Sequence, residues 1–164
     1  MRDHQPENVT KVYLTLDGLD IKYDSINHKP LFTVEEAAAI DGQINGIPCK
    51  NLLTTDKHGN FFLALLQDTK RLDLKKLQQL VRCKHLSFAS EEDLFRILGL
   101  TKGSVSPFGI INDINNEVLL VIDNDFYEHK LLFHPNINTS TISIHFDDLI
   151  KFINHENHKY IFYK

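Results

Sequence analysis

Two apolar segments joined by a polar turn constrain the fold of this chain more than any other feature. Residues Gly46–Asp56 read as a strand, and the turn Asp56–Asn60 leads into the apolar run Phe61–Leu66. Strand-forming runs joined by a turn that contains Asp, Gly and Asn are typical of a β-hairpin. We therefore predict two paired strands in a central sheet.

Side chains alternate between the two faces of a strand. If Leu53 faces the core, Asn51 and Cys49 share its face, whereas Lys50 and its alternate neighbours point to the opposite one. Two interpretations of Lys50 remain open. Its aliphatic stem could lie along the strand with the ammonium in water, or the ammonium could face an anionic or carbonyl group in a cleft.

Length and composition indicate one globular domain spanning residues 1–164. Of the 164 residues, 42% are hydrophobic and 24% are charged, which suits a chain with a substantial core. No run approaches eighteen apolar residues, and the first seven residues are polar and charged, so we expect a cytoplasmic protein without a membrane partner. Cys49 and Cys83 form no CxxC pair and are expected to be reduced thiols.

The charge balance excludes binding of nucleic acid through bulk electrostatics. With 18 Lys+Arg against 22 Asp+Glu the net charge is -4, so DNA is not an expected partner and any RNA must meet a local patch. One segment is densely basic, and it could contact phosphates or simply form a solvated helix face. Its basic residues are Lys70, Arg71, Lys75, Lys76, Arg82, Lys84 and His85.

Periodicity and turn residues predict the remaining elements, whose alternation favours an α/β (α+β) fold. A capping box at Thr33 and Glu36 predicts one helix start, and Asp73 and Ser90 are expected to cap two others. The expected helices cover residues 8–19, 33–40, 73–81, 90–98 and 147–153, and the further strands cover 21–26, 86–89, 110–112, 118–122, 131–133, 142–146 and 160–163.

Two polar segments are candidates for a site. Gly103–Gly109 carries a glycine at each end and Pro107 between them, which makes a stiff loop whose backbone can approach a ligand closely, although a connector can have the same composition. The second segment follows a predicted strand at Phe133 and places His134 among asparagines and a threonine. It could hold an acid or base, or it could be an ordinary turn.

Motifs for other chemistries are missing from the sequence. The nine histidines are scattered without HxH or HExxH, and neither cysteine has a partner at zinc spacing. GxSxG, a P-loop and a dinucleotide fingerprint do not occur. We therefore predict no metal and no cofactor.

Three of these motifs, in this order, resemble the prolyl-tRNA editing-domain family of the YbaK/ProX type, which includes freestanding alanyl-tRNA(Pro) deacylases and the insertion domain of bacterial prolyl-tRNA synthetase. They are Lys50-Asn51-Leu52, Gly103-x-x-x-Pro107 followed by Phe108-Gly109, and His134-Pro135-Asn136 with Asn138-Thr139. Further segments extend the resemblance over nearly the whole chain: residues 32–38, 71–74, 86–90 and 111–113. Leu53, where the family often has phenylalanine, and Cys49, at a variable position, are departures that affect pocket shape.

The resemblance implies a single domain with a curved mixed β-sheet flanked by helices, and hydrolysis of the ester that joins a mischarged amino acid to tRNA(Pro). It implies no metal, because the ribose hydroxyl of the substrate is thought to help activate water in this family. The roles it implies are catalytic for Lys50, Asn51 and His134, and substrate-binding for Gly103, Ser104, Val105, Pro107 and Asn136. From the basic segment, Lys70, Arg71, Lys75 and Lys76 are the candidate tRNA-binding residues.

The substrate that the resemblance favours is alanyl-tRNA(Pro), with prolyl-tRNA synthetase as a candidate partner. A synthetase site shaped for proline gains only about 1 to 3 kcal/mol per methylene against a smaller amino acid, so a second, smaller sieve must remove the error. Cysteinyl-tRNA(Pro) or another mischarged tRNA is an alternative substrate. A non-catalytic module that binds aminoacyl-tRNA is an alternative function.

Overall fold

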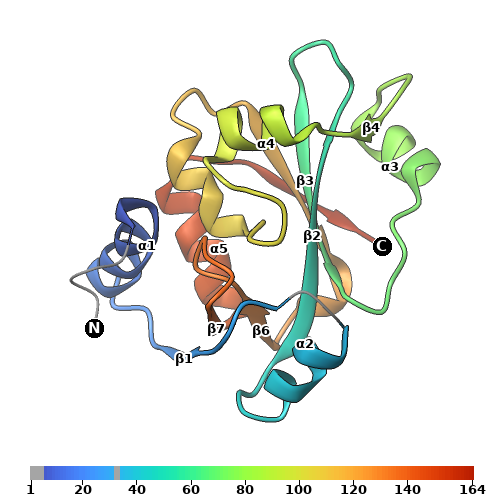
Figure 1. The fold of residues 1–164 in the computed structure, drawn as a ribbon. Coiled ribbons are helices and arrows are strands. Elements are labelled where there is room, and N and C mark those ends of the chain that lie inside the picture. Colours follow the sequence, from blue (N-terminus) through green and yellow to red (C-terminus); the bar gives the residue numbers. More distant parts are fainter. Residues whose placement is uncertain (1–5, 32–33) are drawn as a thin grey trace.

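A mixed sheet of eight strands organises the computed structural model, which describes residues 6–31 and 34–164 (Figure 1). The predicted capping box at Thr33 lies outside the described residues. In chain order the elements are α1 (Glu7–Gly18), β1 (Tyr23–Asn27), α2 (Val34–Asp41), β2 (Ile47–Thr55), β3 (Phe61–Gln67), α3 (Leu74–Val81), β4 (Ser87–Phe88), α4 (Glu91–Leu98), the 3-10 helix η1 (Pro107–Asn112), β5 (Val118–Asp123), the 3-10 helix η2 (Asn124–Phe126), β6 (Lys130–Phe133), β7 (Ser140–His145), α5 (Phe146–His155) and β8 (Tyr160–Tyr163).

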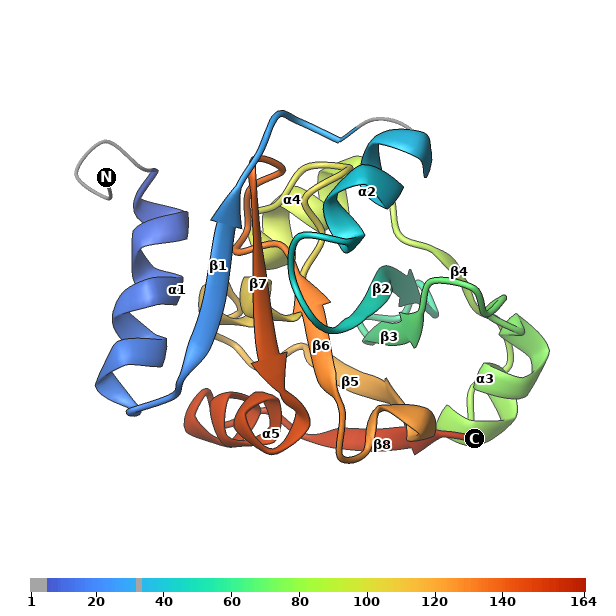
Figure 2. The ribbon, with the colours of Figure 1, turned by 90° about the horizontal axis from the view of Figure 1, so that it is seen from below.

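The strands follow the order β1-β7-β6-β2-β3-β5-β8, and the short β4 pairs with β2. Antiparallel pairs lie at β1/β7, β6/β7, β2/β3 and β2/β4, whereas β2/β6, β3/β5 and β5/β8 are parallel. Figure 2 shows β1 and β7 running in a clearly different direction from β5 and β8, so the sheet curves strongly. The prediction of a curved mixed sheet with helices outside it is confirmed.

The predicted hairpin is confirmed as β2 and β3, which pair antiparallel along their length. Asp56 orders the turn, because its Oδ1 accepts hydrogen bonds from the amides of His58 (2.8 Å) and Asn60 (3.2 Å). Gly59 has a φ of 90°, a conformation that glycine adopts without the penalty of a Cβ.

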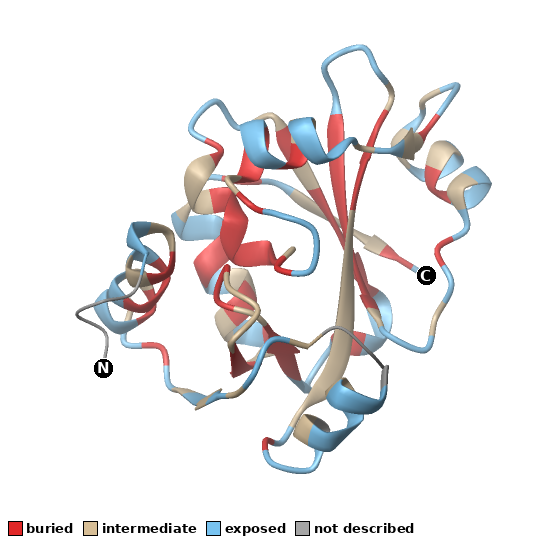
Figure 3. Ribbon diagram, in the orientation of Figure 1, coloured by how far each residue is buried: buried red, intermediate tan, exposed pale blue. Residues whose placement is uncertain are grey.

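Strand β3 contributes to two cores, because successive side chains point to opposite faces of the sheet. A large core joins the sheet to α1, α4, η1 and α5, and a smaller one joins it to α3. Figure 3 shows the buried segments concentrated in the central strands, η1 and α5. Because both of its faces are buried, β3 is a continuous apolar run. Each fully buried Leu or Phe contributes about 1.5 to 3 kcal/mol to stability. The β3 residues of the large core are Phe61, Leu63 and Leu65, and those of the smaller core are Phe62, Ala64 and Leu66.

The two side-chain caps predicted within the described residues are confirmed. Asp73 Oδ1 accepts from the amides of Lys75 and Lys76 at the start of α3. Ser90 Oγ accepts from the amide of Asp93 at the start of α4. Each cap satisfies amides that the first helical turn leaves without a main-chain partner, and replacing it with alanine would cost about 1 kcal/mol.

Two predicted strands are wrong in part or entirely. Residues 110–112 are not a strand but the end of η1, because Ser106 Oγ accepts from the amide of Phe108 and Pro107 fixes φ at the first helical position. Phe146 does not end β7 but begins α5, because the His145 side chain accepts from the amide of Asp147 and starts the helix there.

Candidate active site

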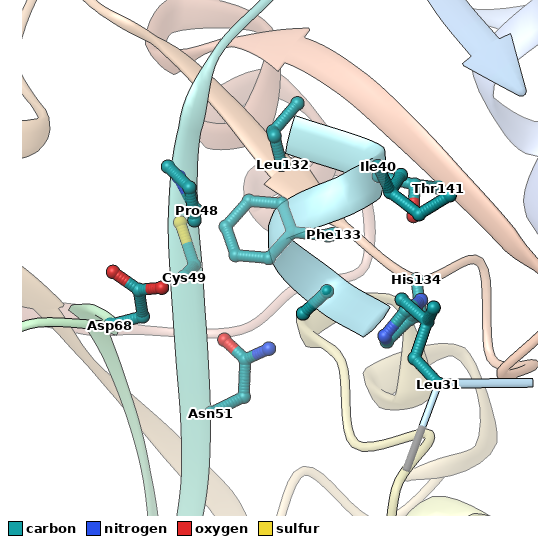
Figure 4. Close-up of a pocket in the computed structure, with 11 residues that line it drawn as sticks. Leu31, Ile40, Pro48, Cys49, Asn51, Asp68, Leu132, Phe133, His134 and Thr141 are labelled. Atoms are coloured by element: carbon teal, nitrogen blue, oxygen red, sulfur yellow. The ribbon is translucent and has the colours of Figure 1, made fainter. Parts of the chain in front are cut away.

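A small cavity lies between β2, α2 and the end of β6, and it holds two of the residues singled out from the sequence. Its volume is about 110 Å³, enough for a few waters or a small chemical group. Figure 4 shows Asn51 on β2 and His134 after β6 on opposite sides of this space, which Phe133 also lines. The lining residues are Leu31, Ala37, Ile40, Pro48, Cys49, Asn51, Asp68, Leu132, Phe133, His134 and Thr141.

Strand β2 separates the cavity from a second, larger pocket. Cys49 and Asn51 line the cavity, whereas Lys50 and Leu52 line the larger pocket. The predicted alternation of side chains along this strand is therefore confirmed. The structure does not bring Lys50 together with Asn51 and His134, so any action of its ammonium on a substrate would come from the other face of β2.

His134 is held in one tautomer by its neighbours. Its Nδ1 donates a hydrogen bond of 2.8 Å to the carbonyl of Ser140, so Nε2 of the neutral ring carries the lone pair. Burial lowers the pKa of His134, and the nearby His28, whose ring centroid is 6.0 Å away, lowers it further against the opposing effect of the Ser140 carbonyl. The ring is therefore neutral at pH 7 and can accept a proton or a hydrogen bond.

Asn51 uses only one end of its amide within the described structure. Its Nδ2 donates a 3.0 Å hydrogen bond to the carbonyl of Val105, which links β2 to the loop before η1. Its Oδ1 is buried and has no hydrogen-bond partner among the described residues. A buried carbonyl oxygen without a donor costs about 1 to 3 kcal/mol, and a substrate group that donates to it would remove that cost.

The predicted glycine-proline loop reaches the neighbourhood of Asn51 through Val105. Gly103 has a φ of 96°, a value that residues with a Cβ rarely adopt. Ser104 is buried and its Oγ donates to the carbonyl of Thr101, while Pro107 is buried at the start of η1. Val105, Asn51 and Leu53 line a third pocket of about 420 Å³. Of the loop residues, Val105 therefore has the most direct contact with a site.

Asn136, which the resemblance assigns to the substrate, does not line the small cavity. Its Nδ2 donates to Oδ1 of Asn8 on α1 (3.0 Å) and to the carbonyl of Phe108 (3.3 Å), while its Oδ1 is buried without a described partner. Asn112 donates to the same Asn8 oxygen at 2.8 Å. These amides tie α1, η1 and the loop after β6 together, so the contacts of Asn136 support the scaffold.

Sequence reasoning missed residues that complete the cavity. Thr141 lines it and its hydroxyl is 2.8 Å from Nε2 of His28. Leu31 also lines it, and Asn138 fixes Leu31 by accepting from its amide (2.9 Å) and donating to its carbonyl (3.2 Å). The one available signal was Asn138, which belongs to the motif after His134.

Within residues 6–31 and 34–164, some side chains of the predicted basic segment have partners and others line a pocket. Lys70 is engaged, because its Nζ lies 2.6 Å from carboxylates of both Asp123 and Asp125. Lys76 lies over the ring of Tyr163, 4.3 Å from its centroid. Arg71 and Lys75 instead line the larger pocket beside Lys50, which has a volume of about 710 Å³. Only part of the predicted tRNA-binding set therefore gathers in one place.

Residues 6–31 and 34–164 contain neither a metal-ligand cluster nor a membrane-spanning helix. No group of three His, Cys, Asp or Glu side chains is arranged to hold a metal ion. No helix in this part of the chain is long and apolar enough to cross a membrane. The prediction of metal-independent activity stays a prediction.

Comparisons with known proteins identify the family of this chain and agree with its fold. Residues 28–152 match the aminoacyl-tRNA editing domain family. The prolyl-tRNA editing protein ProX of Acetoanaerobium sticklandii is 39% identical over 144 residues, which are 87% of this chain and 88% of the relative. The prolyl-tRNA synthetase associated domain-containing protein 1 of Danio rerio is 30% identical over 146 residues, 87% of this chain and 79% of the relative. This chain belongs to the aminoacyl-tRNA editing domain family.

Solved structures show the same fold. A crystal structure of a candidate trans-editing enzyme for prolyl tRNA synthetase superposes with a TM-score of 0.71 over 96% of each chain, at 20% identity. The hypothetical protein APE2540 superposes with a TM-score of 0.72 over 92% of this chain and 96% of that one, at 18% identity. Within the family, this chain is most informatively compared with the prolyl-tRNA editing proteins.

Proposed function

We propose that this chain is a trans-editing hydrolase that cleaves the ester of mischarged tRNA(Pro), with alanyl-tRNA(Pro) as its main substrate. The 39% identity to the prolyl-tRNA editing protein ProX supports the substrate class. The cavity that Asn51 and His134 share carries the proposal, because it offers a neutral imidazole and an unpartnered amide oxygen beside a space for a small side chain. Prolyl-tRNA synthetase would supply the mischarged tRNA, in the cytoplasm.

The size of the cavity supports alanine over proline. Its volume of about 110 Å³ is well below the roughly 300 to 1,000 Å³ that is usual for drug-sized ligands. Much of its wall is apolar, from Leu31, Ala37, Ile40 and Phe133. Such a wall would accept a methyl side chain, and in this proposal its shape excludes the larger proline ring, which is the property that a second sieve needs.

The reaction needs a water oxygen to attack the ester carbonyl carbon. The bond between that carbon and the ribose oxygen breaks, and the ribose oxygen gains a proton, so the products are the free amino acid and tRNA with a free terminal hydroxyl. Nε2 of His134 would accept a hydrogen bond from the attacking water or from the neighbouring ribose hydroxyl. Because the ring is neutral at pH 7 and its tautomer is fixed, it can do so without reorganising.

Asn51 and Lys50 would position the substrate from the two faces of β2. Oδ1 of Asn51 is an acceptor that suits the α-amino group of the aminoacyl ester. Lys50 lies with Arg71 in the larger pocket, so contact with a phosphate of the tRNA end fits its location better than contact with the reacting carbonyl.

The test is a deacylation assay with tRNA(Pro) charged separately with alanine, cysteine or proline. The proposal predicts rapid hydrolysis of the alanyl ester, slow hydrolysis of the prolyl ester, and loss of activity in His134→Ala. Preferred hydrolysis of the cysteinyl ester would keep the enzyme class and change the substrate. Tight binding of aminoacyl-tRNA without hydrolysis would show a non-catalytic module and refute the proposed activity.

A further inference from the structure

Phe88 is an apolar side chain in an unusually exposed place. It is the second residue of β4, it is 56% exposed, and it lines three separate pockets on the surface. Phe95 on α4 is similarly exposed, at 66%, but lines none of them. Exposure alone therefore does not distinguish Phe88 from Phe95, but its position at the border of three pockets does.

The pairing of β4 with β2 determines the direction of the Phe88 ring. Phe88 lies opposite Thr54 in the antiparallel ladder, and directly opposed residues share a face of the sheet. Alternation along β2 then puts Leu52 and Lys50 on this same face. The ring and the ammonium accordingly line one pocket, about 710 Å³ in volume.

Charge on the Lys50 side of Phe88 favours an anion. This pocket is lined by Lys50, Arg71 and Lys75 against one carboxylate, that of Asp73. Asp73 already accepts two main-chain hydrogen bonds as the cap of α3. Within the described part of the chain, none of the three cations forms an ion pair, so they are available to bind a charged ligand. Lys70 and Arg96, by contrast, are paired with carboxylates.

On its other side Phe88 borders a pocket that leads toward the candidate active site. This pocket has a volume of about 420 Å³ and is mostly apolar, with Leu52, Leu94 and Val105 in its wall. The charges of Lys102 and Glu91, which also line it, offset each other. Asn51 lines both this pocket and the small cavity with His134, so a ligand held here would reach the proposed reacting centre.

The remaining pocket that Phe88 lines, beside Arg96, neither carries an excess of cations nor borders Asn51. Its two cations, Lys57 and Arg96, are matched by two carboxylates, those of Asp93 and Glu117, which both lie near Arg96. The pocket therefore has no excess of positive charge. An anionic ligand would therefore be drawn toward the Lys50 side, and an uncharged ring system toward the Asn51 side.

We infer that Phe88 is a stacking platform for the terminal adenine of the unpaired 3′ end of tRNA, with the adjoining phosphate held by Lys50, Arg71 and Lys75. An exposed aromatic ring beside a cationic groove is the arrangement by which proteins bind single-stranded nucleic acid. A protein partner could pack against the apolar ring. It would not require the three cations without ion pairs that lie on the Lys50 side of Phe88. The inference rests on the proposed function for the identity of the RNA, and it adds the residue that receives the base.

The experiment uses uncharged tRNA(Pro) whose terminal adenine is replaced by the fluorescent analogue 2-aminopurine. Stacking on an aromatic ring quenches this fluorophore, so binding and stacking are read separately from hydrolysis. We expect quenching on binding to the full chain and to Phe88→Tyr, which keeps the ring. Phe88→Ala should lose the quenching and bind about tenfold more weakly, within the range that loss of one base stack causes.

Phe95→Ala is the control for Phe88→Ala, and Lys76→Ala is the control for a third test variant, Lys75→Ala. Phe95→Ala removes a similarly exposed ring outside the three pockets and should bind as the unmodified chain does. Lys75→Ala, in the pocket, should weaken binding and lower the salt dependence of log K by about 0.7 for a contact to single-stranded RNA. Lys76→Ala, whose ammonium lies over Tyr163, should change binding much less.

The outcomes separate this inference from the proposed function. Full quenching and unchanged affinity in Phe88→Ala would overturn the inference, even if alanyl-tRNA(Pro) is hydrolysed normally. Loss of affinity without any quenching in the unmodified complex would also overturn it, because the ring would then contact something other than the base. Quenching that depends on Phe88 would support it, even in a chain that hydrolyses none of the three aminoacyl esters.

Discussion

His134 donates a hydrogen bond of 2.8 Å from Nδ1 to the main-chain carbonyl of Ser140. The bond fixes the tautomer, so the lone pair of the neutral ring is on Nε2. Burial and the neighbouring His28 lower the pKa of this imidazole below the usual value of about 6.5. The ring therefore keeps its lone pair to a lower pH than an exposed histidine does.

The first prediction concerns this imidazole. His134→Ala should lower the saturated rate of alanyl-tRNA(Pro) hydrolysis by about 10² to 10⁴, the usual contribution of a positioned acid or base. The acid limb of the pH-rate profile in the unmodified chain should lie below about pH 6.5, because the folded-state pKa is lowered. His58→Ala, an exposed histidine in the hairpin turn, is the control. An acid limb clearly above pH 6.5 would contradict the assignment.

The second prediction concerns Lys50. Lys50→Ala should fold normally, because the residue lies in an open pocket and forms no ion pair with the described residues. It should nevertheless lose most deacylation, since the substrate end would lose a phosphate contact, and Lys50→Arg should retain part of the activity. Circular dichroism and single-turnover rates on the same preparations test both parts. Wild-type rates in Lys50→Ala would remove this residue from the site.

The hairpin and the helix caps could be predicted from sequence because their causes are local. Asp73, Ser90 and the turn at Asp56 each act on amides within four residues of themselves. The failure at residues 110–112 has a local cause as well, because Ser106 and Pro107 start a 3-10 helix just before an apolar run that resembles a strand. There the capping chemistry outweighed the strand propensity.

The composition of the site depended on contacts that no local pattern contains. Lys70, a predicted RNA contact, is paired with carboxylates 53 and 55 residues away. The amide of Asn136, a predicted substrate contact, binds Asn8 at a separation of 128 residues. Alternation along β2 did predict that Lys50 and Asn51 point apart. The sequence did not predict which face of β2 His134 lies on. That depends on the parallel pairing of β2 with β6, the strand that His134 follows.

The third prediction concerns stability and the buried pair of Asp113 and His158. Nε2 of His158 lies 2.8 Å from Oδ2 of Asp113, and both side chains are 1% exposed. Burial opposes both charges, but the mutual hydrogen bond and the surrounding main-chain groups dominate, so the pKa of His158 is raised and that of Asp113 is lowered. The pair ties the end of η1 to the turn before β8.

The sign of each shift determines a pH window. The contribution of His158 is complete below its unfolded pKa of about 6.5 and is lost as pH rises through its raised folded value. The contribution of Asp113 is complete above about 3.9 and is lost as pH falls through its lowered folded value. Urea unfolding should thus show the greatest benefit of the pair between about pH 4 and 6.5.

Two variants test the window. Asp113→Ala should lower the free energy of unfolding at pH 5.5 by about 3 to 5 kcal/mol, because it leaves a buried imidazolium without its partner. His158→Gln should flatten the decline in stability above about pH 6.5. His85→Gln, at an exposed position, should leave that decline as it is in the unmodified chain. Equal pH dependence in His158→Gln and the unmodified chain would show that this pair does not titrate as described.

The fourth prediction concerns metals. Hydrolysis by a positioned water, His134 and the substrate's own hydroxyl does not require a metal, so activity should survive exhaustive dialysis against EDTA. The measurement is the single-turnover rate before dialysis, after it, and after addition of zinc. Activity that is lost on dialysis and restored by zinc would refute the metal-independent mechanism.

The most direct test of the central claim compares single-turnover hydrolysis of alanyl-tRNA(Pro) and prolyl-tRNA(Pro) by the unmodified chain and by Ile40→Ala. Ile40 lines the small cavity from α2, so its truncation should enlarge the space for the aminoacyl group. The account predicts that the unmodified chain prefers the alanyl ester by at least about tenfold, and that Ile40→Ala raises the prolyl rate severalfold with little change in tRNA affinity. Equal rates on both esters in the unmodified chain, or a prolyl rate that Ile40→Ala leaves unchanged, would contradict selection by the size of this cavity.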